Sequence, residues 1–162
     1  PTERYYEEEG RAELTPRDFG ILMHRVFENA ATTDEIYTAI EAMTQDGVLD
    51  EKEAPRLREL VEKALADPVT AEWFGGRWQV VRNENEIILP GSGTTRRPDR
   101  VMTDGERAVV VDYKFGDRET ARHRNQIREY LRLLRQMGYT RTEGYLWYVR
   151  LGRTERVDEK ED

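Results

Sequence analysis

The stretch Val109-Val110-Val111-Asp112-Tyr113-Lys114-Phe115-Gly116 decides how the rest of the chain is interpreted. A run of β-branched apolar residues closed by a glycine is typical of a short strand buried on both faces, and such strands lie centrally in a sheet. Because side chains alternate along a strand, Asp112 and Lys114 lie on one face at its end. A carboxylate can hold a cation, and a nearby ammonium can orient or deprotonate a water. A plain surface ion pair is the other explanation of an isolated D-x-K tripeptide.

The segment before this strand predicts a second strand, antiparallel to the first. Residues 97–103 lead through Asp104-Gly105, a strong two-residue hairpin signal, into the apolar run. Pairing outward from that turn brings Asp99 close to Asp112. Two carboxylates and Lys114 then converge on one point, with the alternative that Asp99 is merely neutralised by a neighbouring arginine.

These residues resemble the PD-(D/E)xK nuclease signature, and the surrounding chain is similar to the RecB/AddA-type nuclease domain at the C-terminus of bacterial helicase-nucleases. That family has a histidine on an early helix, a glutamate before the sheet, G-x-x-D-R-V, D-Y-K-x-G, and then Q-x-x-x-Y on a helix. The corresponding residues occur here in the same order: Gly20-x-x-x-His24, Glu86, Asp99-Arg100-Val101, Asp112-Tyr113-Lys114-x-Gly116 and Gln126-x-x-x-Tyr130.

The resemblance implies metal-dependent hydrolysis of a DNA phosphodiester. Asp99 and Asp112 are expected to hold Mg²⁺, a hard ion that prefers oxygen ligands. The family's pattern adds His24 and the backbone carbonyl of Tyr113 as further ligands. Because Mn²⁺ tolerates a nitrogen ligand more easily, we expect it to substitute for Mg²⁺. Lys114 is expected to position the attacking water and to stabilise the phosphorane. A histidine alone in a helix is usually no ligand, so this assignment of His24 depends on the resemblance.

Three further residues receive roles from the same resemblance. Gln126 and Tyr130, one helical turn apart, are expected to position DNA or the attacking water, although a surface glutamine and a core tyrosine would show the same spacing. Glu86 is expected beside the metal or in contact with its ligands, or else on an edge strand facing solvent. The link at residues 91–95 is longer than the family's usual connection.

The spacing of apolar residues and turn signals predicts an α+β (α/β) chain with the order helix, antiparallel strands, helix, strand. This order resembles the restriction-endonuclease-like core, which implies a central mixed sheet flanked by helices. We expect a linker or frayed segment at residues 1–14, one nuclease domain at 15–157 and a charged tail at 158–162. Within the domain, residues 15–76 are predicted to be helical and residues 77–157 to form the sheet and the catalytic core. Helices are predicted at residues 16–30, 33–46, 50–66, 68–74 and 117–137, and strands at 77–82, 86–90, 97–103, 107–113, 143–150 and 154–157.

Composition limits the partners. The 162 residues contain no cysteine, which excludes disulfides and an iron-sulfur cluster, and no signal or membrane-spanning segment is visible, so a cytoplasmic protein is expected. A net charge of −7 is unfavourable for binding DNA, although residues 116–141 are rich in arginine. We therefore expect weak intrinsic affinity for DNA. Single-stranded or unwound ends would be delivered by helicase domains, and the missing initiator methionine suggests a fragment of such a polypeptide.

The predicted function is thus that of a metal-dependent exonuclease domain of a helicase-nuclease in double-strand break repair and recombination. One alternative is a catalytically silent nuclease-like domain that serves a helicase complex as a DNA-binding or docking module. Another is a stand-alone recombination exonuclease, against which the acidic composition argues.

Overall fold

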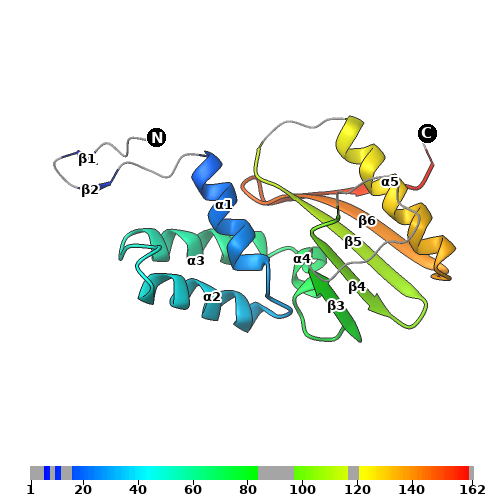
Figure 1. Cartoon of the computed structure of the whole chain (residues 1–162), viewed down its shortest axis with the longest axis horizontal. Helices are drawn as coiled ribbons and strands as arrows, with labels where there is room; N and C mark the ends of the chain where they lie inside the picture. Colours follow the sequence, from blue (N-terminus) through cyan, green and yellow to red (C-terminus); the bar gives the residue numbers. More distant parts are fainter. Residues whose placement is uncertain (1–5, 8–9, 12–15, 84–96, 117–120, 161–162) are drawn as a thin grey trace.

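The computed structural model describes residues 6–7, 10–11, 16–83, 97–116 and 121–160 (Figure 1). The predicted strand at 86–90, Glu86 within it, and the first turn of the last predicted helix therefore lie outside the described residues. Helices and strands follow the chain in this order: β1 (Tyr6–Glu7), β2 (Gly10–Arg11), α1 (Pro16–Phe27), α2 (Thr33–Gln45), α3 (Glu53–Ala64), α4 (Pro68–Trp73), β3 (Val80–Asn83), β4 (Arg100–Asp104), β5 (Arg107–Lys114), α5 (Ala121–Gln136), β6 (Arg141–Tyr148) and β7 (Arg153–Val157).

A mixed sheet in the order β3-β4-β5-β6-β7 forms the centre of the molecule, and β1 pairs with β2 in a separate hairpin. Only β5 and β6 run parallel; the other neighbours in the large sheet are antiparallel. The strand β5 is the middle strand, and Val109, Val110 and Val111 are each 0% exposed. The α+β class and the mixed sheet with a central β5 are thus confirmed.

The sheet is covered on both faces, as Figure 1 shows, and the alternation of β5 divides the core accordingly. Val109, Val111 and Tyr113 pack with the side chains of α1 to α4. Ala108 and Val110 pack with α5. A strand buried on both faces has no polar face, which is why this segment appears in the sequence as a continuous apolar run.

Two local predictions need correction. The β4–β5 register pairs Asp104 with Arg107, so the two-residue turn is Gly105-Glu106 rather than Asp104-Gly105. Gly105 has a φ of 58°, and a glycine with positive φ at the first turn position suits the twist of the flanking strands. The first strand of the sheet begins at Val80 rather than at residue 77. The indole N–H of Trp78 instead donates to the carbonyl of Glu72 at 2.9 Å.

The helical part follows its capping signals. The Oγ1 of Thr32 accepts from the backbone N–H of Glu35, and the Glu35 carboxylate accepts from the backbone N–H of Ala31 at 2.7 Å. Thr32 and Glu35 therefore form a capping box, with its return bond one residue earlier than usual. Asp67 caps α4 by accepting from the backbone N–H of Val69 at 2.8 Å. None of the helices in the described ranges is long and apolar enough to cross a membrane.

We expect Gly144→Ala to destabilise the protein, because α5 lies directly on β6 at this glycine. A Cβ built there would be 2.4 Å from Cγ2 of Ile127 and 3.1 Å from Cδ1 of Leu131. Such overpacking costs about 1–3 kcal/mol. Chemical denaturation measures the loss, and the same substitution at Gly116, where a Cβ meets nothing within 4 Å, is the control. Equal stability of the two variants would contradict the close helix-sheet contact.

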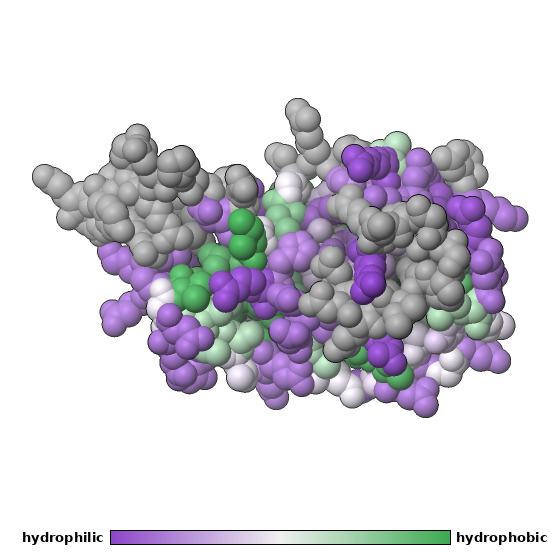
Figure 2. Space-filling view, viewed as in Figure 1, coloured by the Kyte–Doolittle hydropathy of each residue, from purple (hydrophilic) through white to green (hydrophobic). Residues whose placement is uncertain are grey.

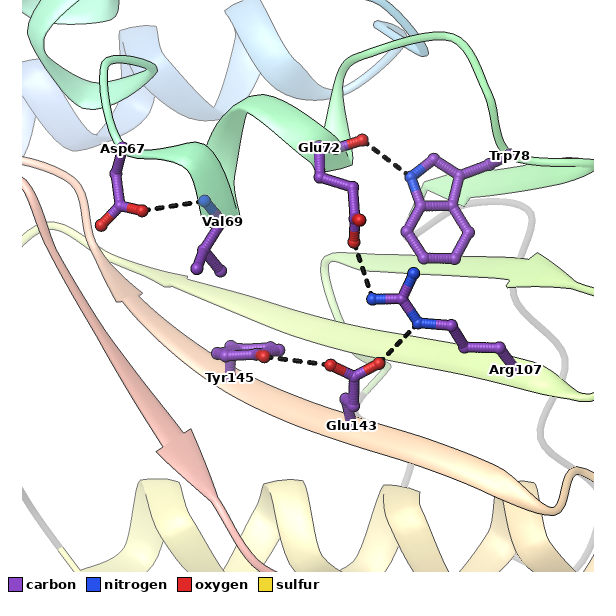
Figure 3. A network of polar contacts seen from close by, with 7 residues as sticks. All are labelled: Asp67, Val69, Glu72, Trp78, Arg107, Glu143 and Tyr145. Atoms are coloured by element: carbon purple, nitrogen blue, oxygen red, sulfur yellow. Dashed lines mark hydrogen bonds and ion pairs between the residues drawn. The ribbon is translucent and has the colours of Figure 1, made fainter.

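A polar network holds α4 to the start of β5, at the opposite end of that strand from Asp112 (Figure 3). The Arg107 guanidinium donates to Glu143 at 2.6 Å and to Glu72 at 2.7 Å, and it lies 4.8 Å from the centroid of the Trp78 ring. Burial alone would raise the pKa of Glu143, but its bonds from Arg107 and from the Tyr145 hydroxyl hold that pKa below its ordinary value.

This depressed pKa predicts a pH-dependent contribution to stability. The ionised Glu143 stabilises the folded state above the unfolded-state pKa, and the contribution is lost as the pH falls through the lower folded-state pKa. Glu143→Gln is expected to cost about 1–2 kcal/mol at pH 7, since a charge-assisted bond that is partly exposed is lost, and progressively less toward pH 3. Denaturation at several pH values measures this. Glu41→Gln, on the exposed face of α2, is the control, and a pH-independent cost would contradict the assignment.

Candidate functional site

Two aspartates face each other where β4 begins and β5 ends. Continuing the β4–β5 register one step beyond Arg100–Val111 places Asp99 opposite Asp112. The backbone N–H of Asp99 donates to Oδ1 of Asp112 at 3.0 Å, and the backbone N–H of Tyr113 donates to Oδ2 of Asp99 at 2.7 Å. Asp112 is buried and Asp99 is half-buried. Each of the two carboxylates, separated by a hairpin in the sequence, thus accepts a backbone N–H from the segment that carries the other.

His24 reaches the same corner from α1. Its Nδ1 lies 3.7 Å from Oδ1 of Asp99, and its ring centroid is 5.0 Å from that of Phe115, just beyond β5. A Cβ on Gly20, one turn earlier in α1, would lie 3.4 Å from Cβ of Phe115. The glycine therefore lets Phe115 pack closely on the helix beside the histidine. The structure brings together His24, Asp99 and Asp112, residues far apart in the sequence.

Lys114 and Tyr113 complete the end of β5. Lys114 is half-buried and, two residues after Asp112, lies on the same face of the strand. Its carbonyl accepts from the backbone N–H of Val149 at 3.0 Å, which fixes the strand end against the chain leaving β6. The Tyr113 side chain points into the opposite layer, where burial raises the pKa of its phenol.

The two predicted positioning residues lie on α5, which covers the face of the sheet that carries Asp112. Tyr130 is 1% exposed and is part of the core between α5 and the sheet. Gln126 is half-buried, and its Oε1 is buried without a hydrogen-bond partner in the described part of the chain. A buried amide oxygen without a partner is unusual and is satisfied by a ligand or a water in functional sites.

The donor atoms suit a divalent cation, although the described residues do not by themselves form a closed site. Two carboxylates, an imidazole and a backbone carbonyl at one strand end are ligands that Mg²⁺ or Mn²⁺ accepts. Within the described ranges no three His, Asp or Glu side chains are arranged to hold an ion. Glu86, a further candidate, lies outside those ranges, so the fit rests on the chemistry of His24, Asp99 and Asp112.

Sequence reasoning missed the role of Arg100. It was a candidate to neutralise Asp99, but it points to the opposite face of β4, where it is 0% exposed and donates to the backbone carbonyls of Ala30, Ala31 and Trp73. The sequence did contain a signal for this role, because Arg100 lies opposite Val111, on the face of the sheet that is apolar. A charge is rarely buried without several hydrogen-bond partners, so an arginine at such a position predicts a set of buried acceptors.

The arginine-rich segment at residues 116–141 carries less unpaired positive charge than its composition suggests. Arg124 forms an ion pair with Glu155 of β7, and Arg135 forms one with Glu159. Arg128 donates to the carbonyl of Asp158 at 3.2 Å. The predicted basic face on α5 is therefore partly neutralised by the acids that follow β6. In the view of Figure 2, hydrophilic residues cover most of the described surface, with a smaller hydrophobic patch over the helical region.

A pocket of about 500 Å³ lies away from this corner, next to the network around Arg107. The residues that line it are Ala71, Glu72, Gly75, Arg77, Trp78, Asp104 and Arg107. None of the described site residues is among them, so this pocket is separate from the carboxylate corner.

A mixed sheet whose central strand ends in paired carboxylates followed by a lysine, with helices on both faces, defines a restriction-endonuclease-like α+β protein. The family comparison agrees: residues 2–162 match the model of the PD-(D/E)XK nuclease superfamily, and the chain belongs to that superfamily. Nuclease activity is the general property of its members. No curated protein matched the chain significantly.

Proposed function

We propose that this domain is a divalent-metal-dependent deoxyribonuclease with its centre at the Asp99–Asp112 corner. The observation that carries the proposal is the pairing of Asp99 with Asp112 near the end of β5, two residues before Lys114. Membership of the nuclease superfamily supports the reaction class, hydrolysis of a phosphodiester.

Asp99 and Asp112 would hold Mg²⁺, with His24 and the carbonyl of Tyr113 as further ligands and Mn²⁺ as a substitute. A bound divalent cation supplies a Lewis acid and lowers the pKa of bound water. The chain itself supplies rigidity: each carboxylate is fixed by a backbone N–H, so little reorganisation is needed when charge develops.

Lys114 would orient the attacking water and offset charge on the phosphorane, because its ammonium lies on the face of β5 that carries Asp112. Gln126 would hold DNA or that water through its amide, and its buried Oε1 supports this role. Tyr130 would act by placing α5, since its ring is part of the core. Glu86 would support the metal or its ligands.

We further propose that the domain is the RecB/AddA-like exonuclease part of a helicase-nuclease in double-strand break repair and recombination. The ordered motifs from His24 to Tyr130 support this subgroup. The net charge of −7 and the ion pairs that neutralise Arg124 and Arg135 support weak binding of DNA on its own. Helicase domains would then deliver single-stranded or unwound ends to the cytoplasmic complex.

The test is degradation of linear single-stranded and double-stranded DNA, labelled at either end, with Mg²⁺, Mn²⁺ or EDTA. We expect cutting that needs a metal, that is stronger on single strands and that releases short products from an end. Asp104→Asn, which alters an exposed carboxylate at the far end of β4, should cut like the wild type.

A silent docking module is the alternative that the open arrangement of His24, Asp99 and Asp112 favours. Calorimetric titration with Mn²⁺ separates the two. A working site gives saturable heat that disappears in Asp112→Asn, whereas a silent domain gives no saturable heat in either protein.

A further inference from the structure

Arg100 carries a formal charge in a place where no water reaches it. It is the first residue of β4, it is 0% exposed, and it follows Asp99 directly. A guanidinium stays charged in proteins, and burying a charge is costly unless it is well hydrogen-bonded. Its retention at this position therefore calls for a specific set of partners.

Those partners are backbone carbonyls in the connection between α1 and α2 and at the last residue of α4. One terminal nitrogen donates to the carbonyl of Ala30 at 2.5 Å, and the other donates to the carbonyls of Ala31 at 2.9 Å and Trp73 at 2.8 Å. The guanidinium also lies 4.0 Å from the centroid of the Phe74 ring. The last carbonyls of a helix, such as that of Trp73, have no partner within it, and buried carbonyls in a connection also need a donor, so a buried cation is well matched to all three.

The connection to the site runs through α1. Ala30 and Ala31 lie three and four residues beyond the end of this helix, in its connection to α2, and the last turn of the helix carries His24. Asp99, the residue before Arg100, lies with Oδ1 at 3.7 Å from the His24 imidazole. Asp99 therefore contacts α1 at His24, and the next residue, Arg100, contacts the connection that follows α1.

We propose that Arg100 is a positioning residue that holds α1 at the end of the sheet, so that His24 and Asp99 face one cation. This inference rests on the proposed function, because it needs a cation at that corner. A purely structural residue would affect stability alone, whereas we expect Arg100 to affect metal affinity as well, and only through His24.

A double-mutant cycle on Mn²⁺ affinity, measured by calorimetry, tests it. The proteins are the wild type, His24→Ala, Arg100→Lys and the double variant. We expect each single variant to weaken Mn²⁺ binding by about tenfold or more, as loss of a ligand or of a group that orients one does. The double variant should bind within about threefold of His24→Ala, because the groups act as a unit. Additive losses, about a hundredfold together, would overturn the proposal.

Controls separate positioning from loss of stability. Leu134→Ala removes a buried side chain from the core on the α5 face and should lower stability without changing Mn²⁺ affinity. If Arg100→Lys does not fold, Phe74→Leu is the second variant, because it removes the ring contact of Arg100 and keeps its three bonds to carbonyls. Phe74→Leu should weaken Mn²⁺ binding less than tenfold. It should have no effect on Mn²⁺ binding in a protein that also carries His24→Ala. Equal affinity in Phe74→Leu and the wild type would count against the proposal.

Failure of the proposed function gives a different result. A wild type with no saturable Mn²⁺ heat would remove both the cation site and this inference. Saturable wild-type binding with additive variants would remove the inference alone.

Discussion

Asp112→Asn is expected to lower the rate of DNA cleavage by at least about a thousandfold while leaving the fold intact. The asparagine Oδ1 can still accept the backbone N–H of Asp99, a bond of 3.0 Å in the structure, so the main change is loss of negative charge at the proposed cation. Removing one electrostatic group from a catalytic site costs about two to three decades, and a metal ligand at least as much.

The measurement is a single-turnover rate with Mg²⁺ or Mn²⁺, together with denaturation of the same preparations. We expect the free energy of unfolding to stay within about 1 kcal/mol of the wild type, since the shape and the acceptor are kept. Asp104→Asn is the matched variant at the far end of the same hairpin. Cleavage by Asp112→Asn at the wild-type rate would move the catalytic centre away from this corner.

Arg100→Met is expected to cause the largest loss of stability of the substitutions considered, about 3–5 kcal/mol. Methionine fills part of the volume but donates nothing, so the carbonyls of Ala30, Ala31 and Trp73 lose their donor in a buried place. Each such loss costs about 1–3 kcal/mol, and removing a buried charge offsets part of the sum.

Urea denaturation measures this loss, and Arg141→Met is the matched control. Arg141 is exposed at the start of β6, so its replacement should change the free energy of unfolding by less than about 0.5 kcal/mol. Because domains have only about 5–15 kcal/mol in total, Arg100→Met should be marginal at 37 °C. A loss below about 1 kcal/mol would show that the guanidinium is not needed to hold the helices.

The two expected effects, loss of cleavage and loss of stability, trace back to the adjacent residues Asp99 and Arg100, whose side chains point to opposite faces of the sheet. Asp99 is hydrogen-bonded to Asp112 at the end of β5, whereas Arg100 is directed into the layer of α1 to α4. The alternation of a strand thus allows one short motif to supply a ligand on one side and a support on the other.

Much of this arrangement was predictable because it is local. The apolar run 109–111 identified the central strand, and the hairpin signal at Asp104-Gly105 predicted that the Asp99 end of one strand lies near the Asp112 end of the other. The exact register was not predicted, because a turn at Asp104-Gly105 would place Asp99 opposite Val110, whereas the observed turn at Gly105-Glu106 places it opposite Asp112. Side-chain alternation then placed Lys114 on the face of Asp112. Helix capping by Thr32 and Asp67 was readable for the same reason, since a capping bond joins residues two or three positions apart.

The remaining features depend on how the layers pack, and no short stretch of sequence contains that information. The 3.7 Å approach of His24 to Asp99 follows from the packing of α1 on the sheet and was suggested beforehand only by resemblance to a family. The bonds of Arg100 to the carbonyls of Ala30 and Trp73 and the pairing of Arg124 with Glu155 join residues 27 or more positions apart. The sequence by itself determined that β5 is a central strand, that β4 is its antiparallel neighbour and that Asp99 comes close to Asp112, because these features follow from apolar runs and turn residues that are local in the chain. Only the tertiary structure decided which charges are buried, paired or brought to the cation corner, because those outcomes depend on contacts between separate layers.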